Sequence, residues 1–129
     1  MECPACRARM VSFAVPLEYR EHVPESSDCA ALCPECLTLV AANSASDDPR
    51  FDRISSEFPD NEAAVPLALA VGLLDSLALH RTALQDLLPA VEAAGVDPLL
   101  VLDRLEVQGG VQPKFDLGRR RHQLEQLLD

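Results

Sequence analysis

Lysine is nearly missing from this sequence, since Lys114 is the only one and the other ten basic residues are arginines. Tryptophan is absent and aromatic residues make up only 4%, so a core must be built from leucine, valine and alanine. The longest apolar stretch, residues 63–80, contains Pro66 and Asp75 and is shorter than the ~20 apolar residues of a membrane-spanning helix. The first residues also lack a basic-then-apolar leader pattern. These absences predict a soluble, cytoplasmic protein with no membrane partner.

Acidic residues outnumber basic ones, and the formal net charge is −10. The acidic residues are scattered, and an apolar fraction of 48% separates the chain from disordered acidic proteins. Such an acidic, lysine-poor composition resembles that of proteins from salt-loving organisms; an acidic protein from a GC-rich genome is the alternative. In molar salt the screening length shrinks to about 3 Å and phosphate binding loses its counterion-release drive. Net charge therefore decides neither for nor against nucleic-acid binding.

Four of the five cysteines form two Cys-Pro-x-Cys turns, with Cys3 and Cys6 in the first and Cys33 and Cys36 in the second. Two such turns can aim four thiolates at one ion at about 2.3 Å, and a shell closed by four protein ligands is structural. The sequence predicts one structural zinc ion held by these four residues. A single iron is the alternative ion, and four unliganded buried thiols are the alternative to any ion.

The residues around the turns raise three further points. Arg7 and Arg9 follow the first turn and can offset the net charge of about −2 that four thiolates leave on Zn²⁺. Zinc-ribbon turns usually carry glycine after the second cysteine, where this chain has Arg7 and Leu37. The fifth cysteine, Cys29, is a small core residue, a spare ligand or a redox thiol.

The pattern along the chain predicts an α+β protein made of a small zinc ribbon followed by an all-α domain of about five helices. We expect the four-cysteine module at residues 1–42, a linker at 43–48 and the helical domain at 49–129. Strands are predicted at three places, which are 11–15, 17–23 and 37–41. Helices are predicted at 49–58, 60–79, 82–95, 98–106 and 117–128.

N-cap residues and the helix-breaking residues proline and glycine define the expected helix boundaries. The N-caps are expected at Asp48, at Asp60 or Asn61, and at Thr82, Asp97 and Asp116. Pro89 should kink or split the third helix, and Gly95 should end it. Gly109 and Gly110 should end the region of the fourth helix.

Two other groups outside the cysteines are candidates. Asp75 interrupts the most apolar helix, which indicates a buried ion pair with Arg81, Arg104 or an arginine of the last helix, or a catalytic carboxylate. His80 is expected to interact with the C-terminal dipole of that helix. The last helix begins with Arg119, Arg120 and Arg121, which form internal ion pairs or a docking patch; Arg121 can pair with Glu125.

These features favour a non-enzymatic adaptor whose metal module or last helix docks another protein. No glycine-rich phosphate loop, nucleophile elbow or metalloprotease motif occurs, and no small-molecule substrate is evident. The alternative is a nucleic-acid-binding zinc ribbon linked to transcription or translation, with Arg7, Arg9 and Arg20 as contacts. The third hypothesis is a redox or hydrolytic role through Cys29 or Asp75.

The turns CPAC and ALCPEC, the segments FDRISSEFP and ALAVGLLDSLALHR, and the ending FDLGRRRHQLEQLL carry a family resemblance. Together they are similar to a family of uncharacterised small proteins from halophilic archaea, over nearly the full length. Because the cysteine turns are common to many zinc proteins, the helical segments carry most of the likeness. The resemblance implies a zinc-finger-like N-terminus, a helical C-terminal region and no assigned activity.

Overall fold

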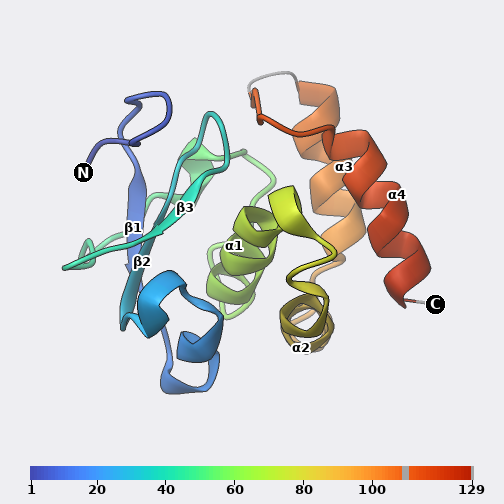
Figure 1. Ribbon diagram of the computed structural model, residues 1–129, viewed down its shortest axis with the longest axis horizontal. Coiled ribbons are helices and arrows are strands. Elements are labelled where there is room, and N and C mark those ends of the chain that lie inside the picture. Colours follow the sequence, from blue (N-terminus) through green and yellow to red (C-terminus); the bar gives the residue numbers. More distant parts are fainter. Residues whose placement is uncertain (109–110, 129) are drawn as a thin grey trace.

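A computed structural model describes the protein over residues 1–108 and 111–128. It is an α+β fold, as predicted, with an antiparallel sheet on one side and helices on the other (Figure 1). The sheet has the order β1-β2-β3, with β1 at Val11–Ala14, β2 at Cys29–Leu32 and β3 at Leu39–Ala41.

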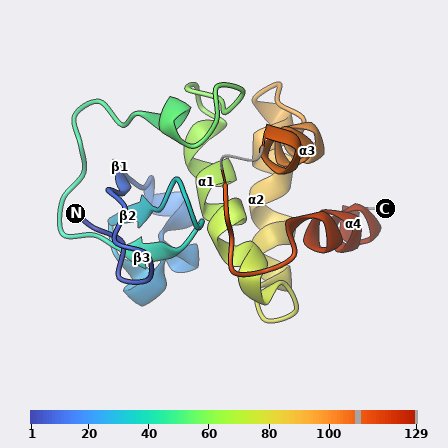
Figure 2. The same ribbon diagram turned by 90° about the horizontal axis from the view of Figure 1, so that it is seen from above.

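The α-helices follow in chain order after the sheet. They are α1 (Ala64–Leu73), α2 (Arg81–Ala93), α3 (Pro98–Gln108) and α4 (Leu117–Leu128). Short 3-10 helices are η1 (Leu17–His22), η2 (Pro24–Ser26), η3 (Phe51–Arg53) and η4 (Leu74–Ser76). Two views agree that α1 lies between the sheet and the remaining α-helices (Figures 1 and 2).

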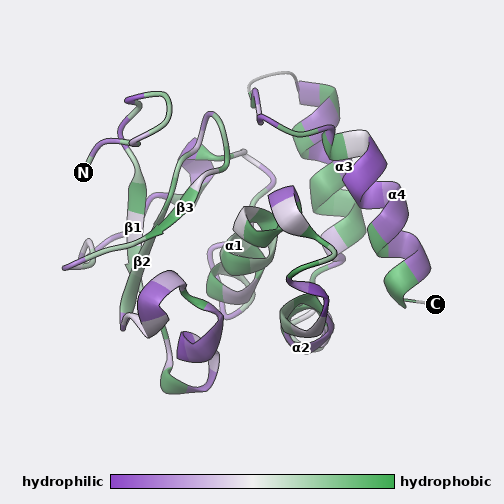
Figure 3. Ribbon diagram, viewed as in Figure 1, coloured by the Kyte–Doolittle hydropathy of each residue, from purple (hydrophilic) through white to green (hydrophobic). Residues whose placement is uncertain are grey.

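Helix α1 is the centre of the fold, as its apolar sequence predicted. Nine of its ten residues are buried, and it is apolar along its whole length (Figure 3). One face of the sheet shares a core with this helix, to which β1 contributes Val11 and Phe13 and β2 contributes Leu32. The same core continues into η3 and all four α-helices. The division into 1–42, 43–48 and 49–129 stays a prediction, and the core is continuous across it.

Two of the three predicted strands are confirmed, and one is wrong. The segment predicted as a strand at 17–23 instead forms η1 over Leu17–His22, with the Tyr19 N–H donating to the Pro16 carbonyl at 3.0 Å. The remaining strand, β2, was not among the three predicted from the sequence. It is the central strand, and Ala30, Ala31 and Leu32 are buried on both faces, so it lacks the alternating pattern that marks a half-exposed strand.

The predicted helix at 49–58 is also mostly wrong, because only η3 forms there. The Ser55 hydroxyl accepts the Glu57 N–H at 3.1 Å, a local bond that competes with helix formation. Phe51 and Phe58 stack in the core with ring centroids 5.8 Å apart. The burial of both rings therefore stabilises an irregular backbone in this segment in place of the predicted continuous helix.

Two of the predicted caps are confirmed in detail. The Asp97 carboxylate accepts the Leu99 N–H at 3.0 Å, and the Asp116 carboxylate accepts the Arg119 N–H at the same distance. Gly95 ends α2 with a φ of 88°. The expected caps at Asp48 and Thr82 are wrong, because Arg50 flanks η3 and His80 flanks α2.

Three further expectations concern helix ends and interruptions. Helix α2 continues through Pro89, so the helix is not split there. Helix α1 ends at Leu73, before His80, so His80 does not lie at its C-terminus. The expected stop at Gly109 and Gly110 lies outside the described residues. None of the helices in the described part of the chain combines the length and apolar character needed to cross a bilayer.

Candidate metal centre

The first cysteine turn is closed by two backbone hydrogen bonds. The Arg7 N–H donates to the Cys3 carbonyl at 2.8 Å, and the Cys3 N–H donates to the Ala8 carbonyl at 2.8 Å. The turn reverses the chain just before β1, and a bridge between Glu2 and Arg9 joins its two arms. This local hairpin holds Cys3 and Cys6 on the same side of the loop.

The second turn repeats the first. The Leu37 N–H donates to the Cys33 carbonyl at 3.0 Å, and the Cys33 N–H donates to the Thr38 carbonyl at 2.9 Å. This turn joins β2 to β3, so the sheet positions Cys33 and Cys36 directly. The two turns are therefore equivalent hairpins placed at the same end of the sheet.

Both turns adopt the left-handed backbone conformation without glycine. Arg7 has a φ of 68° and Leu37 a φ of 63°, at the two positions where glycine was expected to be required. Non-glycine residues pay roughly 1–2 kcal/mol for this conformation. The turns therefore adopt this geometry with arginine and leucine in place of the usual glycine, at the cost of a small backbone strain.

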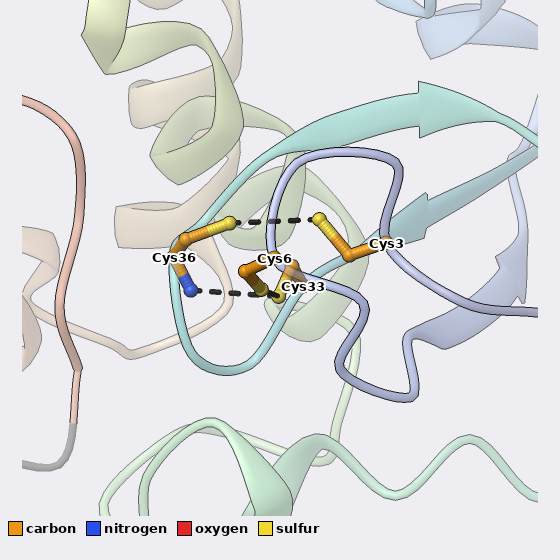
Figure 4. A group of neighbouring side chains, drawn as sticks. All are labelled: Cys3, Cys6, Cys33 and Cys36. Atoms are coloured by element: carbon orange, nitrogen blue, oxygen red, sulfur yellow. Dashed lines mark hydrogen bonds between the residues drawn. The ribbon is translucent and has the colours of Figure 1, made fainter.

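The structure brings the four predicted cysteines together. The Cys3 and Cys36 sulfurs are 3.6 Å apart and the Cys6 and Cys33 sulfurs are 3.4 Å apart (Figure 4). All four sulfurs lie within 4.8 Å of one another. A tetrahedron with metal–sulfur bonds of about 2.3 Å has sulfur edges of about 3.8 Å. The group could therefore hold one tetrahedral metal ion with little movement.

Backbone and hydroxyl donors surround the sulfurs. The Ala5 N–H lies 3.4 Å from the Cys3 sulfur, and the Cys36 N–H lies 3.4 Å from the Cys33 sulfur. The Thr38 hydroxyl lies 3.0 Å from the Cys36 sulfur. Donors of this kind stabilise thiolates and fix the orientation of metal ligands.

Burial and hydrogen bonding split the pKa values of the thiols. Burial raises the pKa of the Cys33 thiol to about 12. Burial also raises the pKa of Cys3, but backbone N–H groups of Cys6 and Ala5 and neighbouring thiols lower it more, to about 6. An ion must displace protons from these thiols, so metal binding releases protons and weakens as the pH falls.

A segment from the helical part covers the second turn. The Gln112 N–H donates to the Glu35 carbonyl at 2.6 Å, and both residues line a hollow of about 230 Å³ beside Cys6 and Cys36. Cys6 is exposed, whereas the other three cysteines of the group are buried. No sequence pattern links Gln112 to the cysteines, so this contact was missed.

Cys29 lies apart from the group of four. It is half-buried at the start of β2 and packs against a small cluster on the face of the sheet away from α1. Its N–H donates to the Ser27 hydroxyl at 3.3 Å. The cluster contains Met10, Ala31 and three of the grouped cysteines, so Cys29 contributes a small side chain to the packing beneath the four-cysteine group.

The arginines expected to contact nucleic acid do not gather in one place. Arg7 and Arg9 precede β1, whereas Arg20 follows it in η1, at the other end of the sheet (Figure 1). The Arg20 Nε donates to the Val15 carbonyl at 3.0 Å. The flanking Glu18 and Glu21 are exposed. Arg20 therefore has acidic neighbours, which weighs against a shared nucleic-acid surface.

The prediction of a buried ion pair at Asp75 is wrong. Asp75 is exposed in η4, because the apolar helix ends at Leu73 and the chain turns toward α2. Its backbone carbonyl, rather than its carboxylate, accepts a bond from Arg120 Nη2 at 3.4 Å. Asp75 lines a hollow of about 380 Å³ together with His22 and His80.

The three arginines of α4 have different environments. Arg121 pairs with Glu125 at 2.9 Å, as its spacing predicted. Arg120 Nη1 donates to the Gln123 side chain at 2.9 Å, and Arg119 is exposed. Arg120 also lines a groove of about 330 Å³ between α4 and the turn before α2. The groove residues are Leu77, Ala78, Arg81, Arg120, Gln123, Gln126 and Leu127.

A histidine contact between η1 and α2 was also missed. His22 Nε2 lies 2.7 Å from an Asp86 carboxylate oxygen and 3.7 Å from a Glu21 oxygen. The histidine side chain is only 10% exposed, whereas the two carboxylates are mostly exposed. The partners are 64 positions apart in the chain, and no local pattern could reveal the pair.

Comparison with known proteins gives one family match. A family model described as a family of unknown function, DUF6276, matches residues 2–128. No curated protein matches the chain, and no solved structure matches it.

Proposed function

The chain belongs to the family of unknown function DUF6276; because that family supplies no activity to transfer, we propose from the site itself that the protein is a non-enzymatic zinc-binding adaptor. In this proposal a structural zinc ion clamps the two cysteine turns into a zinc ribbon. The helical part then presents a surface to another protein. A soluble, cytoplasmic role at high salt fits the acidic composition and the resemblance to haloarchaeal proteins.

The sulfur geometry is the observation that carries the metal assignment. All four sulfurs converge within 4.8 Å, and all four ligands come from one chain. Such a shell has no open position for a substrate or a water nucleophile, which favours a structural role. Four thiolates suit zinc best, and a single iron is the alternative.

Elemental analysis of the purified protein tests this assignment. We expect one zinc per chain in the native protein and less than one in a Cys33→Ser variant. The matched control is Cys29→Ser, which makes the same substitution outside the group of four and should keep full metal content. Protein with no bound metal at all would contradict the proposal, and iron in place of zinc would correct the ion.

The groove beside α4 supports the adaptor role. Arg81 and Arg120 line it together with Gln123 and Gln126, and no carboxylate does so within the described residues. In a chain of net charge −10, a groove with two arginines and no acid is suited to an acidic partner. Leu77 and Leu127 at its wall add an apolar contact. We therefore expect the partner to insert an acidic segment that also carries an apolar side chain.

A capture experiment in molar potassium chloride tests this role. A specific partner should be retained by the wild-type protein and lost with the Arg81→Gln/Arg120→Gln double variant. Arg104, exposed on α3, offers the control, because Arg104→Gln removes a charge away from the groove. A partner that binds the double variant as well as the wild type would rule out the groove. Stabilisation by a metabolite with no partner recovered would rule out the adaptor role.

A further inference from the structure

A second basic hollow lies between the edge of β1 and the segment that leads into η3. It has a volume of about 360 Å³. Arg9 reaches it from the end of the first cysteine turn, whereas Arg50 and Arg53 reach it from around η3, more than 40 positions later in the chain. Ser12 of β1 and Ser46 of the connecting segment also line it.

Two of the three guanidinium groups are held in place by bonds that leave other N–H groups free for a ligand. Arg50 makes a two-pronged pair with Asp52, with distances of 3.1 and 2.9 Å. Arg53 Nη2 donates to the Arg9 carbonyl at 2.6 Å. A guanidinium carries five N–H donors, so each keeps several available. Arg53, which is held by a backbone carbonyl, loses less side-chain entropy when it binds an anion, whereas the exposed pair with Asp52 orients Arg50 only weakly.

The charge balance of the hollow is opposite to that of the protein. Three arginines line it against one carboxylate, Asp48, and Asp52 offsets Arg50 from outside the lining, so one positive charge is in excess, whereas the whole chain has a net charge of −10. Neighbouring guanidinium groups repel one another, and a bound anion would reduce this repulsion. Arginine forks match the oxygens of phosphate in particular. We propose that this hollow, which we call the Arg9–Arg50–Arg53 hollow, binds a phosphate group.

The other walls indicate an ester of phosphate rather than the free ion. Met1, which is 59% exposed, and Pro49 supply apolar surface beside the arginines, over the nearly buried Met10 and Val11. The Ser46 hydroxyl oxygen accepts the Asp48 N–H at 3.3 Å, so its own proton can be donated to a phosphate oxygen. The hollow therefore offers charged donors for the phosphate and apolar surface for an attached organic group. A phosphorylated metabolite and the backbone of a nucleic acid share this chemistry.

The test is binding measured by calorimetry on the metal-loaded protein. Inorganic phosphate, ribose 5-phosphate and a short single-stranded oligonucleotide are titrated at one ionic strength fixed with potassium chloride. We expect ribose 5-phosphate to bind more tightly than inorganic phosphate. Tighter binding of the oligonucleotide would support the site and identify nucleic acid as the source, and no oligonucleotide binding would support it with a small phosphorylated molecule as the source.

The variants distinguish a built site from general attraction to basic residues. Arg9→Gln keeps the carbonyl that Arg53 needs, so the fold should be preserved, and phosphate affinity should fall by about tenfold or more. Arg104→Gln removes one positive charge on α3 and should leave the affinity unchanged. A loss of affinity that is equal in the two variants, or no phosphate binding by the wild type, would overturn the proposal. Neither variant replaces a cysteine, but Arg9 lies in the first cysteine turn, so metal content is measured in both variants. With equal metal content, either result is independent of the zinc assignment and of the adaptor role.

Discussion

The two faces of the small sheet are stabilised in different ways. The face toward α1 buries large side chains, among them Phe13, Leu32 and Leu37. The opposite face buries Ala31, Ala42 and one larger side chain, Met10, together with three of the four grouped thiols, since Cys6 is exposed. A buried leucine or phenylalanine contributes about 1.5–3 kcal/mol, and an alanine far less. From this comparison we propose that the helix-facing side can stand on apolar burial alone, whereas the cysteine-facing side depends on a bound ion.

The largest effect should come from removing a ligand on the cysteine-facing side. Cys33→Ser replaces a fully buried sulfur, and we expect metal affinity to fall by more than about 100-fold, beyond the loss typical of changes around a ligand. Competition with a metal-binding dye measures this. Cys29→Ser is the matched control and should change affinity little. Equal losses in the two variants would mean that the four cysteines are not the site.

On the helix-facing side the largest loss of stability should come from a substitution that leaves a cavity in the core. Leu67 of α1 is fully buried, and Leu67→Ala should lower the free energy of unfolding by about 2–5 kcal/mol. Urea denaturation measures the loss. Leu79→Ala, at a side chain that is 79% exposed, should cost less than about 0.5 kcal/mol. Leu67→Ala should also keep one metal per chain, and loss of the metal would show that the two sides are not stabilised separately.

Gly72 tests the close contact between α1 and the helix-facing side of the sheet. A Cβ at this position of α1 would collide with the Leu39 side chain of β3 close to its backbone, so neither element can move away easily. Gly72→Ala should therefore cost about 1–3 kcal/mol by overpacking. Gly118→Ala in α4 is the control, because it meets only the flexible end of Glu106. If both variants gained stability in urea denaturation, the close approach of α1 to the sheet would be wrong.

The smallest effect should come from relieving strain in a cysteine turn. Arg7 is exposed with a φ of 68°, so Arg7→Gly should raise the free energy of unfolding by about 1 kcal/mol. Leu37 has the same conformation but is buried in the main core, and Leu37→Gly should destabilise the protein because the lost burial outweighs the relief. Thermal unfolding of the metal-loaded variants compares them. Destabilisation by Arg7→Gly would show that the turn is not strained.

Local signals in the sequence were sufficient where one short segment decides the structure. The caps at Asp97 and Asp116, the stop at Gly95 and the pairing of Arg121 with Glu125 each depend on residues within four positions. The four cysteines were also recognisable, because their paired spacing is itself the signal. These features needed no knowledge of the tertiary fold.

Features created by distant packing could not be predicted in the same way. Strand β2 is buried on both faces, so its alternation is hidden. Segment 17–23 reads as a strand, but its flanking prolines and hydrogen bonds favour a 3-10 helix. The contacts of Gln112 with Glu35 and of Arg53 with Arg9 join segments more than 40 positions apart. The sequence alone therefore grouped Arg9 with Arg20, although its neighbours are Arg50 and Arg53.

Hydrogen exchange before and after removal of the metal by a chelator tests the central claim most directly. The claim is that an ion holds the cysteine-facing side, while apolar packing holds the helices. We predict that the N–H groups of Arg7 and Leu37, which close the two turns, lose their protection when the metal is removed. Amides in α2 and α3 should keep theirs. Unchanged protection in the turns, or equal loss in the turns and the helices, would contradict the account.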